Sequence, residues 1–371
     1  MFRFFKEVVT PAGMLASLII GAGMFSLPFV FARSGAITAA IYLIIMAFMM
    51  NEVHRSYAEI IEAAGDEERF AGYAGKYLGM AGKTVGGLAV IAGLIISLTI
   101  YLTLSASFIH LVFPAVPMSA AVICFWVIGA VLSVAGIRSF AGLDTIFFIG
   151  IAAIVGVIVV MGSIFGDFNA IKLFPTDTIG IFLPLAPVLF SLSGRSAISS
   201  IKEYFKERRF DEKNFKRAIS LGSFFPIIVY AAFVVGVTML SPEGVAADAV
   251  SGMTVMPVIL GVLIGILGFL ALITSYVFLG MELRGIFERD LKVPSVIAAI
   301  SIVSLPIVLY FMGFNNFLWL ISLAGGLFLA IESIMVIMMR RVATRKRRAI
   351  DIFLIAILLS AIIYEIARFG A

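Results

Sequence analysis

The sequence is poor in the residues that build disulfides, metal centres and redox sites. Its 371 residues include one cysteine and two histidines, so we expect no disulfide and no thiolate or imidazole metal site. Cys124 lies within an apolar run, and His54 and His110 lie towards the ends of two different apolar segments. A membrane-embedded enzyme or a haem-binding subunit would need convergent acids or histidines. We therefore expect neither an enzyme nor a resident cofactor.

Charged residues are also scarce. They make up 13% of the chain, against 62% hydrophobic residues, and the mean hydropathy is +1.15. Many apolar runs exceed the roughly 18 residues that indicate a membrane-spanning helix. The formal net charge of +5 comes from basic residues in the connections between these runs, where they set membrane orientation rather than bind nucleic acid. The sequence predicts an all-α polytopic membrane protein.

We predict eleven transmembrane helices in a single transporter domain, residues 1–371. Basic residues cluster in alternate connections, so the positive-inside rule places the N-terminus in the cytoplasm. An odd number of helices then places the C-terminus outside the cell membrane. The predicted helices are residues 8–32, 34–62, 84–113, 117–137, 140–165, 178–205, 215–240, 253–287, 293–312, 315–340 and 347–368.

Small residues interrupt two of these segments at corresponding positions. Gly21 and Gly23 lie near the middle of segment 8–32, and Ser191-Leu-Ser-Gly194 interrupts segment 178–205, roughly 170 residues later. Glycine costs about 1 kcal/mol in a helix interior relative to alanine. Backbone groups freed at membrane depth must face a cavity rather than lipid. The alternative is that these residues only allow close helix packing, which does not explain their matched positions.

The matched breaks predict an internal repeat. Each repeat would hold five helices, an odd number, so the second repeat must run inverted relative to the first. We assign 8–165 and 176–340 to the two repeats and 347–368 to an extra helix. Paired broken helices in inverted halves are typical of a transporter with its site at the bilayer midplane. An ion channel is the alternative from another class, but nothing in the sequence resembles a selectivity filter.

Several motifs carry a family likeness. They are Gly21-Ala-Gly-Met-Phe-Ser-Leu-Pro-Phe29, Asn51-Glu-Val53, Phe70-Ala-Gly-Tyr-Ala-Gly-Lys-Tyr-Leu-Gly79, Thr274-Ser-Tyr-Val-Phe-Leu-Gly280 and Phe287-Glu-Arg-Asp290. In this order the chain resembles the amino acid–polyamine–organocation superfamily, and within it the amino acid/auxin permeases and the bacterial aromatic amino acid permeases. The resemblance implies a five-plus-five inverted repeat of the leucine-transporter type that carries amino acids by alternating access. Ser191–Gly194, followed by Arg195, departs from the aromatic and histidine usual there, so the resemblance alone does not predict an aromatic substrate.

A zwitterionic amino acid in a low-dielectric cavity needs a partner for each of its charges. The amides of Gly21, Ala22 and Gly23 begin a half-helix and suit the carboxylate. The carbonyls around Phe190 and Ser191 end another half-helix and suit the ammonium. Tyr101 is either a carboxylate ligand or a packed aromatic, and serines in membrane helices often bond their own backbone. The remaining substrate-site candidates are Ser26, Ser193, Gly194 and Ser196.

A set of oxygens on two segments predicts a sodium site. Thr274 and Ser275 supply adjacent hydroxyls, and Ala271 supplies a carbonyl one turn earlier. The carbonyls of Ser17 and Ile20 bring the set to about five oxygens, as hard cations prefer. This spacing resembles the sodium site of sodium-coupled members of the fold, although Thr-Ser pairs are common in membrane helices. Met24 stands where a second sodium site would need a side-chain oxygen, so we expect one ion.

Three ionisable residues inside helices bear on gating and coupling. Arg195 begins a half-helix, where the helix dipole disfavours a cation, so it either pairs with a carboxylate such as Glu52 or meets the substrate. Proton-coupled relatives can place a lysine of the fifth helix where sodium would sit, but segment 140–165 has no lysine and only one ionisable residue, Asp144. The sequence predicts a monomeric, sodium-coupled symporter of neutral amino acids. The alternative is proton coupling, with Glu52 or Asp144 as the carrier.

Overall fold

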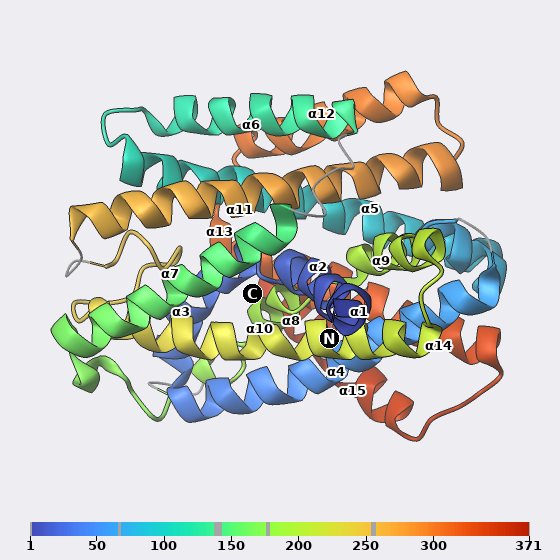
Figure 1. Ribbon diagram of the computed structural model, residues 1–371, viewed down its shortest axis with the longest axis horizontal. Coiled ribbons are helices and arrows are strands. Elements are labelled where there is room, and N and C mark those ends of the chain that lie inside the picture. The colour runs from blue at the N-terminus through green and yellow to red at the C-terminus, as the bar shows by residue number, and fades with distance from the viewer. Residues whose placement is uncertain (1, 66–67, 137–142, 176–178, 254–256, 371) are drawn as a thin grey trace.

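The computed structural model describes the chain except residues 1, 66–67, 137–142, 176–178, 254–256 and 371. Within the described residues, every regular element is a helix (Figure 1). Each predicted apolar segment corresponds to one helix or to a chain of shorter ones, because backbone groups in lipid must bond within their own segment. The prediction of an all-α membrane protein is confirmed.

The first predicted helix is divided. The short α1 (Phe2–Phe4), the π-helix η1 (Phe5–Val9) and α2 (Thr10–Ile19) precede its break, and the 3-10 helix η2 (Ala22–Ser26) and α3 (Leu27–Ser34) follow it. The next four segments form α4 (Ala36–Ala64), α5 (Phe70–Val112), α6 (Met118–Ala135) and α7 (Leu143–Phe165). α5 begins earlier than predicted because it includes a first helical stretch that is kinked at Gly79, whose φ of 73° suits a glycine.

The second half of the chain follows the same order. Two 3-10 turns, η3 (Phe168–Ala170) and η4 (Ile179–Ile181), precede a second divided helix, α8 (Leu185–Ser191) and α9 (Arg195–Arg208). α10 (Glu212–Leu240), α11 (Val258–Gly285) with the π-helix η5 (Ile286–Asp290), and α12 (Ser295–Phe311) come next. The tenth segment is α13 (Phe317–Ser322), the π-helix η6 (Leu323–Leu329) and α14 (Ala330–Thr344), and α15 (Ile350–Gly370) ends the chain.

Length and composition identify several of the described helices as membrane spans. Seven are long and apolar enough to cross a membrane, and an eighth span is the bent pair Phe5–Ile19 and Ala22–Ser34, whose halves meet at 48°. The apolar helices Ile149–Phe165 and Ser295–Phe311 are shorter. The protein is therefore a multi-pass membrane protein. Eleven crossings and the sides on which the termini lie stay predictions.

The two divided helices meet and run antiparallel. α2 packs on α9, whereas η2 and α3 pack on α8. The half before one break thus contacts the half after the other, which only antiparallel helices can do. In Figure 1, α2 and α8 lie in the middle of the molecule, with α6, α11 and α12 on one side and α4 and α15 on the other. Both breaks therefore lie in the interior.

The packing of the other helices agrees with two related halves. α4 packs on α14, and α10 packs on α7. α4 and α14 are the second and tenth predicted helices, and α10 and α7 are the seventh and fifth. Replacing the second helix by the seventh and the tenth by the fifth therefore turns the first pair into the second. This exchange is what an inverted repeat requires. The repeat boundaries, 8–165 and 176–340, stay a prediction.

Candidate functional site

The first divided helix unwinds at Ile20 and Gly21. Ile20 has φ −77° and ψ 63°, and Gly21 has φ −109° and ψ −149°. Ala22 and Gly23 begin the next helix, so their amides have no carbonyl acceptor one turn earlier. The Tyr101 hydroxyl lies close to the Ala22 backbone and to the Ser275 side chain. Tyr101 therefore joins the first break to the residues predicted to bind sodium.

The second divided helix unwinds over Leu192, Ser193 and Gly194. Gly194 has φ −144° and ψ 11°, and its N–H donates to Nε2 of His54 at 3.0 Å. The other ring nitrogen of His54, Nδ1, lies 2.9 Å from the Ser223 hydroxyl, which donates its own proton to a backbone carbonyl of α10. These partners require a neutral His54 that is protonated on Nδ1. The fully buried imidazole thus holds one amide of the break in place.

A single buried tyrosine contacts both breaks. The hydroxyl of Tyr230, on α10, lies 2.6 Å from the Ile19 carbonyl and 2.6 Å from the Ser191 carbonyl. These are the last carbonyls before the two breaks, and helix C-termini leave such groups without intrahelical donors. The hydroxyl has one proton, so it donates a hydrogen bond to one of these carbonyls at a time. Tyr230 therefore sets the spacing between the divided helices.

Tyr230→Phe is expected to lower kcat/KM for uptake about tenfold or more while the protein still folds. The ring would still fill its site, but a buried carbonyl would lose its donor, which costs about 1–3 kcal/mol. Initial uptake rates in proteoliposomes, compared with thermal unfolding of the purified variant, check this. The control is Tyr310→Phe, since Tyr310 lies on α12, away from both breaks. Unchanged uptake kinetics in Tyr230→Phe would show that the hydroxyl does not position the breaks.

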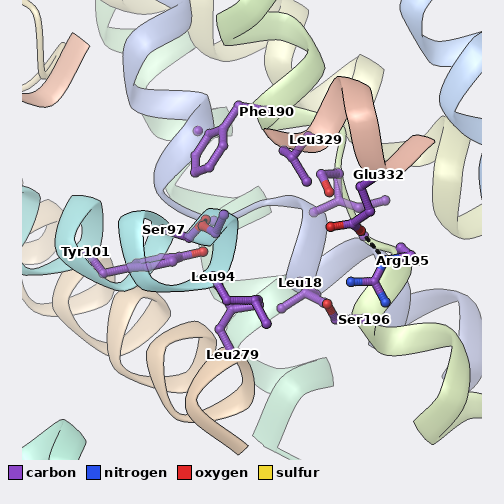
Figure 2. Close-up of a pocket in the computed structure, with 16 residues that line it drawn as sticks. Leu18, Leu94, Ser97, Tyr101, Phe190, Arg195, Ser196, Leu279, Leu329 and Glu332 are labelled. Atoms are coloured by element: carbon purple, nitrogen blue, oxygen red, sulfur yellow. Dashed lines mark hydrogen bonds and ion pairs between the residues drawn. The ribbon is translucent and has the colours of Figure 1, made fainter. Parts of the chain in front are cut away.

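A cavity lies where the two breaks meet. Its wall combines backbone from both breaks with apolar side chains and one ion pair. Figure 2 shows Tyr101 and Phe190 on one side of it and Arg195 with Glu332 on the other. Of the ten residues predicted to bind substrate, seven line this cavity: Gly21, Gly23, Tyr101, Phe190, Ser193, Gly194 and Ser196.

The other three predicted substrate residues do not line the cavity. The Ser26 hydroxyl donates to the Gly23 carbonyl at 2.7 Å, and the Ser191 hydroxyl donates to the Pro187 carbonyl at 2.7 Å. Both serines thus bond their own helix, as small hydroxyls in membrane helices often do. The backbone of Ala22 lies close to the Tyr101 hydroxyl instead. The side chains of these three residues have no place in the cavity wall.

A second, smaller cavity brings together three of the five predicted sodium ligands. Ser17, Thr274 and Ser275 line it, and Ser200 of α9 adds a fourth hydroxyl. The Thr274 hydroxyl donates to the Ala271 carbonyl at 3.0 Å, so a fourth predicted ligand adjoins this cavity. Ile20, the fifth, is the first unwound residue after α2. Hydroxyls of α2, α9 and α11 therefore converge, as a site for a hard cation requires.

The charged residues pair differently from the prediction. Arg195 bonds Glu332, and its Nη1 lies 3.6 Å from Oε1 of Glu282. The predicted partner Glu52 was wrong, because Glu52 bonds Arg348 instead. Arg348 lies between α14 and α15 and also bonds Glu59, two turns further along α4, at 2.7 Å. Asp144 belongs to α7, but its side chain lies outside the described residues.

Four important side chains were not recognised in the sequence as site residues: His54, Tyr230, Glu282 and Glu332. All four are buried. A charged residue within a membrane segment is a functional candidate by default because it is costly there, but the sequence positions of Glu282 and Glu332 near helix ends favoured gating or snorkelling charges over site residues. His54 and Tyr230 carried no comparable indication, since each acts on backbone that is distant in sequence.

Comparisons with known proteins agree with this geometry. Among solved structures, the chain is similar to an Eremococcus coleocola manganese transporter bound to an aromatic bis-isothiourea compound, with a TM-score of 0.66, 13% identity and coverage of 100% of this chain and 88% of that one. It is also similar to MhsT in complex with L-phenylalanine, with a TM-score of 0.63, 14% identity and coverage of 96% and 97%. No curated protein sequence matches the chain.

These likenesses define the fold as that of transporters of the leucine-transporter type. The model of the tryptophan/tyrosine permease family matches residues 6–357, so the chain belongs to that family. The predicted resemblance to aromatic amino acid permeases is confirmed. The protein is a membrane transporter of amino acids and not an enzyme.

Proposed function

We propose that the chain is a sodium-coupled symporter that carries neutral amino acids, aromatic ones among them, by alternating access. The observation that carries this proposal is the central cavity, where two divided helices present backbone polar groups beside apolar walls. Freed backbone at membrane depth is tolerated where it lines such a cavity.

The two breaks present partial charges of opposite sign to the carboxylate and the ammonium of an amino acid. Gly21 and Gly23, at the start of η2, line the cavity on the positive end of the helix dipole, which favours a carboxylate. The Tyr101 hydroxyl lies beside the Ala22 amide and would donate to a carboxylate bound there. The Phe190 and Ser191 carbonyls already accept bonds from the Ser193 N–H and from Tyr230. A carbonyl has a second lone pair, so both still suit an ammonium.

The family match and one residue of the cavity wall support aromatic amino acids as substrates. The unwound segment Leu192–Gly194 has no aromatic residue, but the Phe190 ring, just before it, lines the cavity (Figure 2). An aromatic ring at this place can pack edge-on or offset against a ring of the substrate. The family name supports tryptophan and tyrosine as the substrate class.

Sodium coupling is supported by the second cavity. Its hydroxyls belong to α2, half of a divided helix, and to α11. A bound cation would therefore connect α2, which must move during transport, to α11, which packs against α5. The set has oxygen ligands only, which suits sodium. A cation bound in one conformation and released in the other couples its gradient to the substrate.

Uptake into proteoliposomes tests the proposal. We expect labelled L-tyrosine or L-tryptophan to accumulate when a sodium gradient is imposed, and to accumulate little with a proton gradient alone. N-acetylated and amidated forms of the same amino acids should fail to compete, because each loses one of the two charges. A proton-driven uptake in sodium-free buffer would overturn the coupling, and competition by both blocked forms would overturn the binding mode.

A further inference from the structure

The ion pair between Arg195 and Glu332 lies in the wall of the central cavity. Both side chains line the cavity, and both are nearly inaccessible to solvent, at 3% and 5% exposed. In Figure 2 they occupy the side of the cavity opposite Tyr101 and Phe190. Tyr101 lies beside the backbone that suits the substrate carboxylate. The pair therefore lies where the far end of a substrate side chain would reach.

Each of the two glutamates at this pair has an arginine partner without a substrate. Arg195 donates to Glu332, and its Nη1 lies near Glu282. Nη1 of Arg69 donates to Glu282 at 3.1 Å. The Arg195 guanidinium also lies over the rings of Tyr57 and Phe70, 5.1 Å and 4.6 Å from their centres. Asp290 accepts the backbone amides of Arg69 and Gly72. A charged substrate side chain would disturb this pairing, so the pair favours a neutral one.

The pair nevertheless offers unused hydrogen-bonding capacity to a neutral group. An ionised carboxylate only accepts hydrogen bonds, and its two oxygens can take about four, whereas Glu332 receives one from Arg195. Nη1 of Arg195 is buried and makes no hydrogen bond with any of the described residues. A ligand group with an O–H or N–H would donate to Glu332, and a hydroxyl oxygen would also accept from Arg195.

Leucine side chains and the Ser196 hydroxyl line the wall near the pair. Leu94 and Leu279 face the cavity from one side, and Leu18 and Leu329 lie next to the ion pair (Figure 2). A flat apolar ring would pack against such side chains, and its polar edge would then meet the buried carboxylate. We infer that Arg195 and Glu332 form the side-chain subsite of the transporter and select aromatic amino acids whose ring carries a hydrogen-bond donor. This inference rests on the proposed function and names the substrate group that the cavity recognises.

The first experiment uses the unmodified protein and substrates that differ at one atom or group. Uptake of labelled L-tyrosine is measured in proteoliposomes with L-phenylalanine and O-methyl-L-tyrosine as competitors. We expect both competitors to bind roughly 10- to 100-fold more weakly than tyrosine, because neither donates to the buried carboxylate. L-Tryptophan should compete well through its indole N–H, whereas its 1-methyl derivative should not.

Equal competition by tyrosine, phenylalanine and O-methyl-tyrosine would overturn the subsite and leave the amino-acid transporter intact. Failure to bind any of these amino acids would overturn the proposed function as well. The two failures therefore give different results in one assay.

The second experiment assigns the selectivity to a residue. Glu332→Gln keeps an oxygen for the Nε of Arg195 and the shape of the side chain, but it removes the charged acceptor. We expect the preference for tyrosine over phenylalanine to fall about tenfold or more, with little change in the affinity for phenylalanine. The control is Ser105→Ala, because Ser105 lies on the same helix as the cavity residue Tyr101 but outside the cavity lining, and its buried hydroxyl bonds the Leu102 carbonyl at 2.7 Å. An unchanged preference in a folded Glu332→Gln protein would exclude Glu332 as the selecting group.

Discussion

Replacing Gly23 by valine is expected to abolish amino-acid uptake. A Cβ atom at Gly23 would lie 2.6 Å from the Cα of Ser191, 2.8 Å from its hydroxyl and 3.0 Å from the ring of Phe190. The nearest of these atoms is backbone of the second break and cannot rotate away. The divided helices would have to separate, and the cavity between them would lose its shape. The sequence argument assigned this position to the substrate carboxylate, and the structure adds contact between the two breaks as a second reason for glycine.

Gly23→Ala and Gly156→Val complete this test. Alanine introduces only the Cβ atom, so a strong loss of uptake in Gly23→Ala would identify the contact with Ser191 as the cause. Gly156, on α7, has open space around its Cβ position and is exposed on the surface of the described structure, so valine there should leave uptake unchanged. Uptake by Gly23→Val at the rate of the unmodified protein would show that the breaks can separate without loss of function.

The fold was predictable because its determinants are local in the sequence. Each apolar run gives its own helix, since a membrane segment must satisfy its backbone internally. The breaks were predictable from Gly21, Gly23 and Gly194, because glycine weakens a helix wherever it stands. The same reasoning placed seven of the ten substrate candidates around one cavity, since residues beside two touching breaks are necessarily close together.

The partners of the buried polar groups could not be predicted in the same way. His54 and Gly194 are 140 residues apart, and Arg195 and Glu332 are 137 apart. Which carboxylate meets Arg195 depends on how α9 and α14 pack against each other and against α4, and these are contacts between segments far apart in the sequence. Glu52 was the wrong choice for this reason: it faces the connection that holds Arg348.

One contact suggests how substrate and ion would influence each other. Tyr101 lies beside the Ala22 backbone at the substrate site and beside the Ser275 side chain at the predicted ion site. A carboxylate bound near Ala22 would turn the Tyr101 hydroxyl towards itself, which changes the bonding of the Ser275 hydroxyl. The binding free energies at the two sites would then be linked, and such linkage acts equally in both directions.

This link gives Thr274→Ala and Ser275→Ala different expected results. Both variants remove a hydroxyl from the second cavity, and interactions with a charged group contribute about 1.5–3 kcal/mol. We therefore expect each to raise the sodium concentration for half-maximal uptake roughly 10- to 100-fold. Ser275→Ala should also change the affinity for the amino acid at saturating sodium, because it removes the hydroxyl beside Tyr101, whereas Thr274→Ala should not.

Sodium titrations of uptake at fixed and at saturating amino acid measure these effects. Ser304→Ala is a suitable control, since the Ser304 hydroxyl on α12 bonds the Ile300 carbonyl of its own helix at 2.7 Å and should leave both titrations unchanged. Sodium in the second cavity would hold α2 against α11 and favour one conformation, and its release would free the N-terminal half of the first divided helix to move. Coupling arises from this difference in affinity between conformations. Uptake that is independent of sodium, and indifferent to both substitutions, would remove the second cavity from the mechanism and direct attention to protons as the coupling ion.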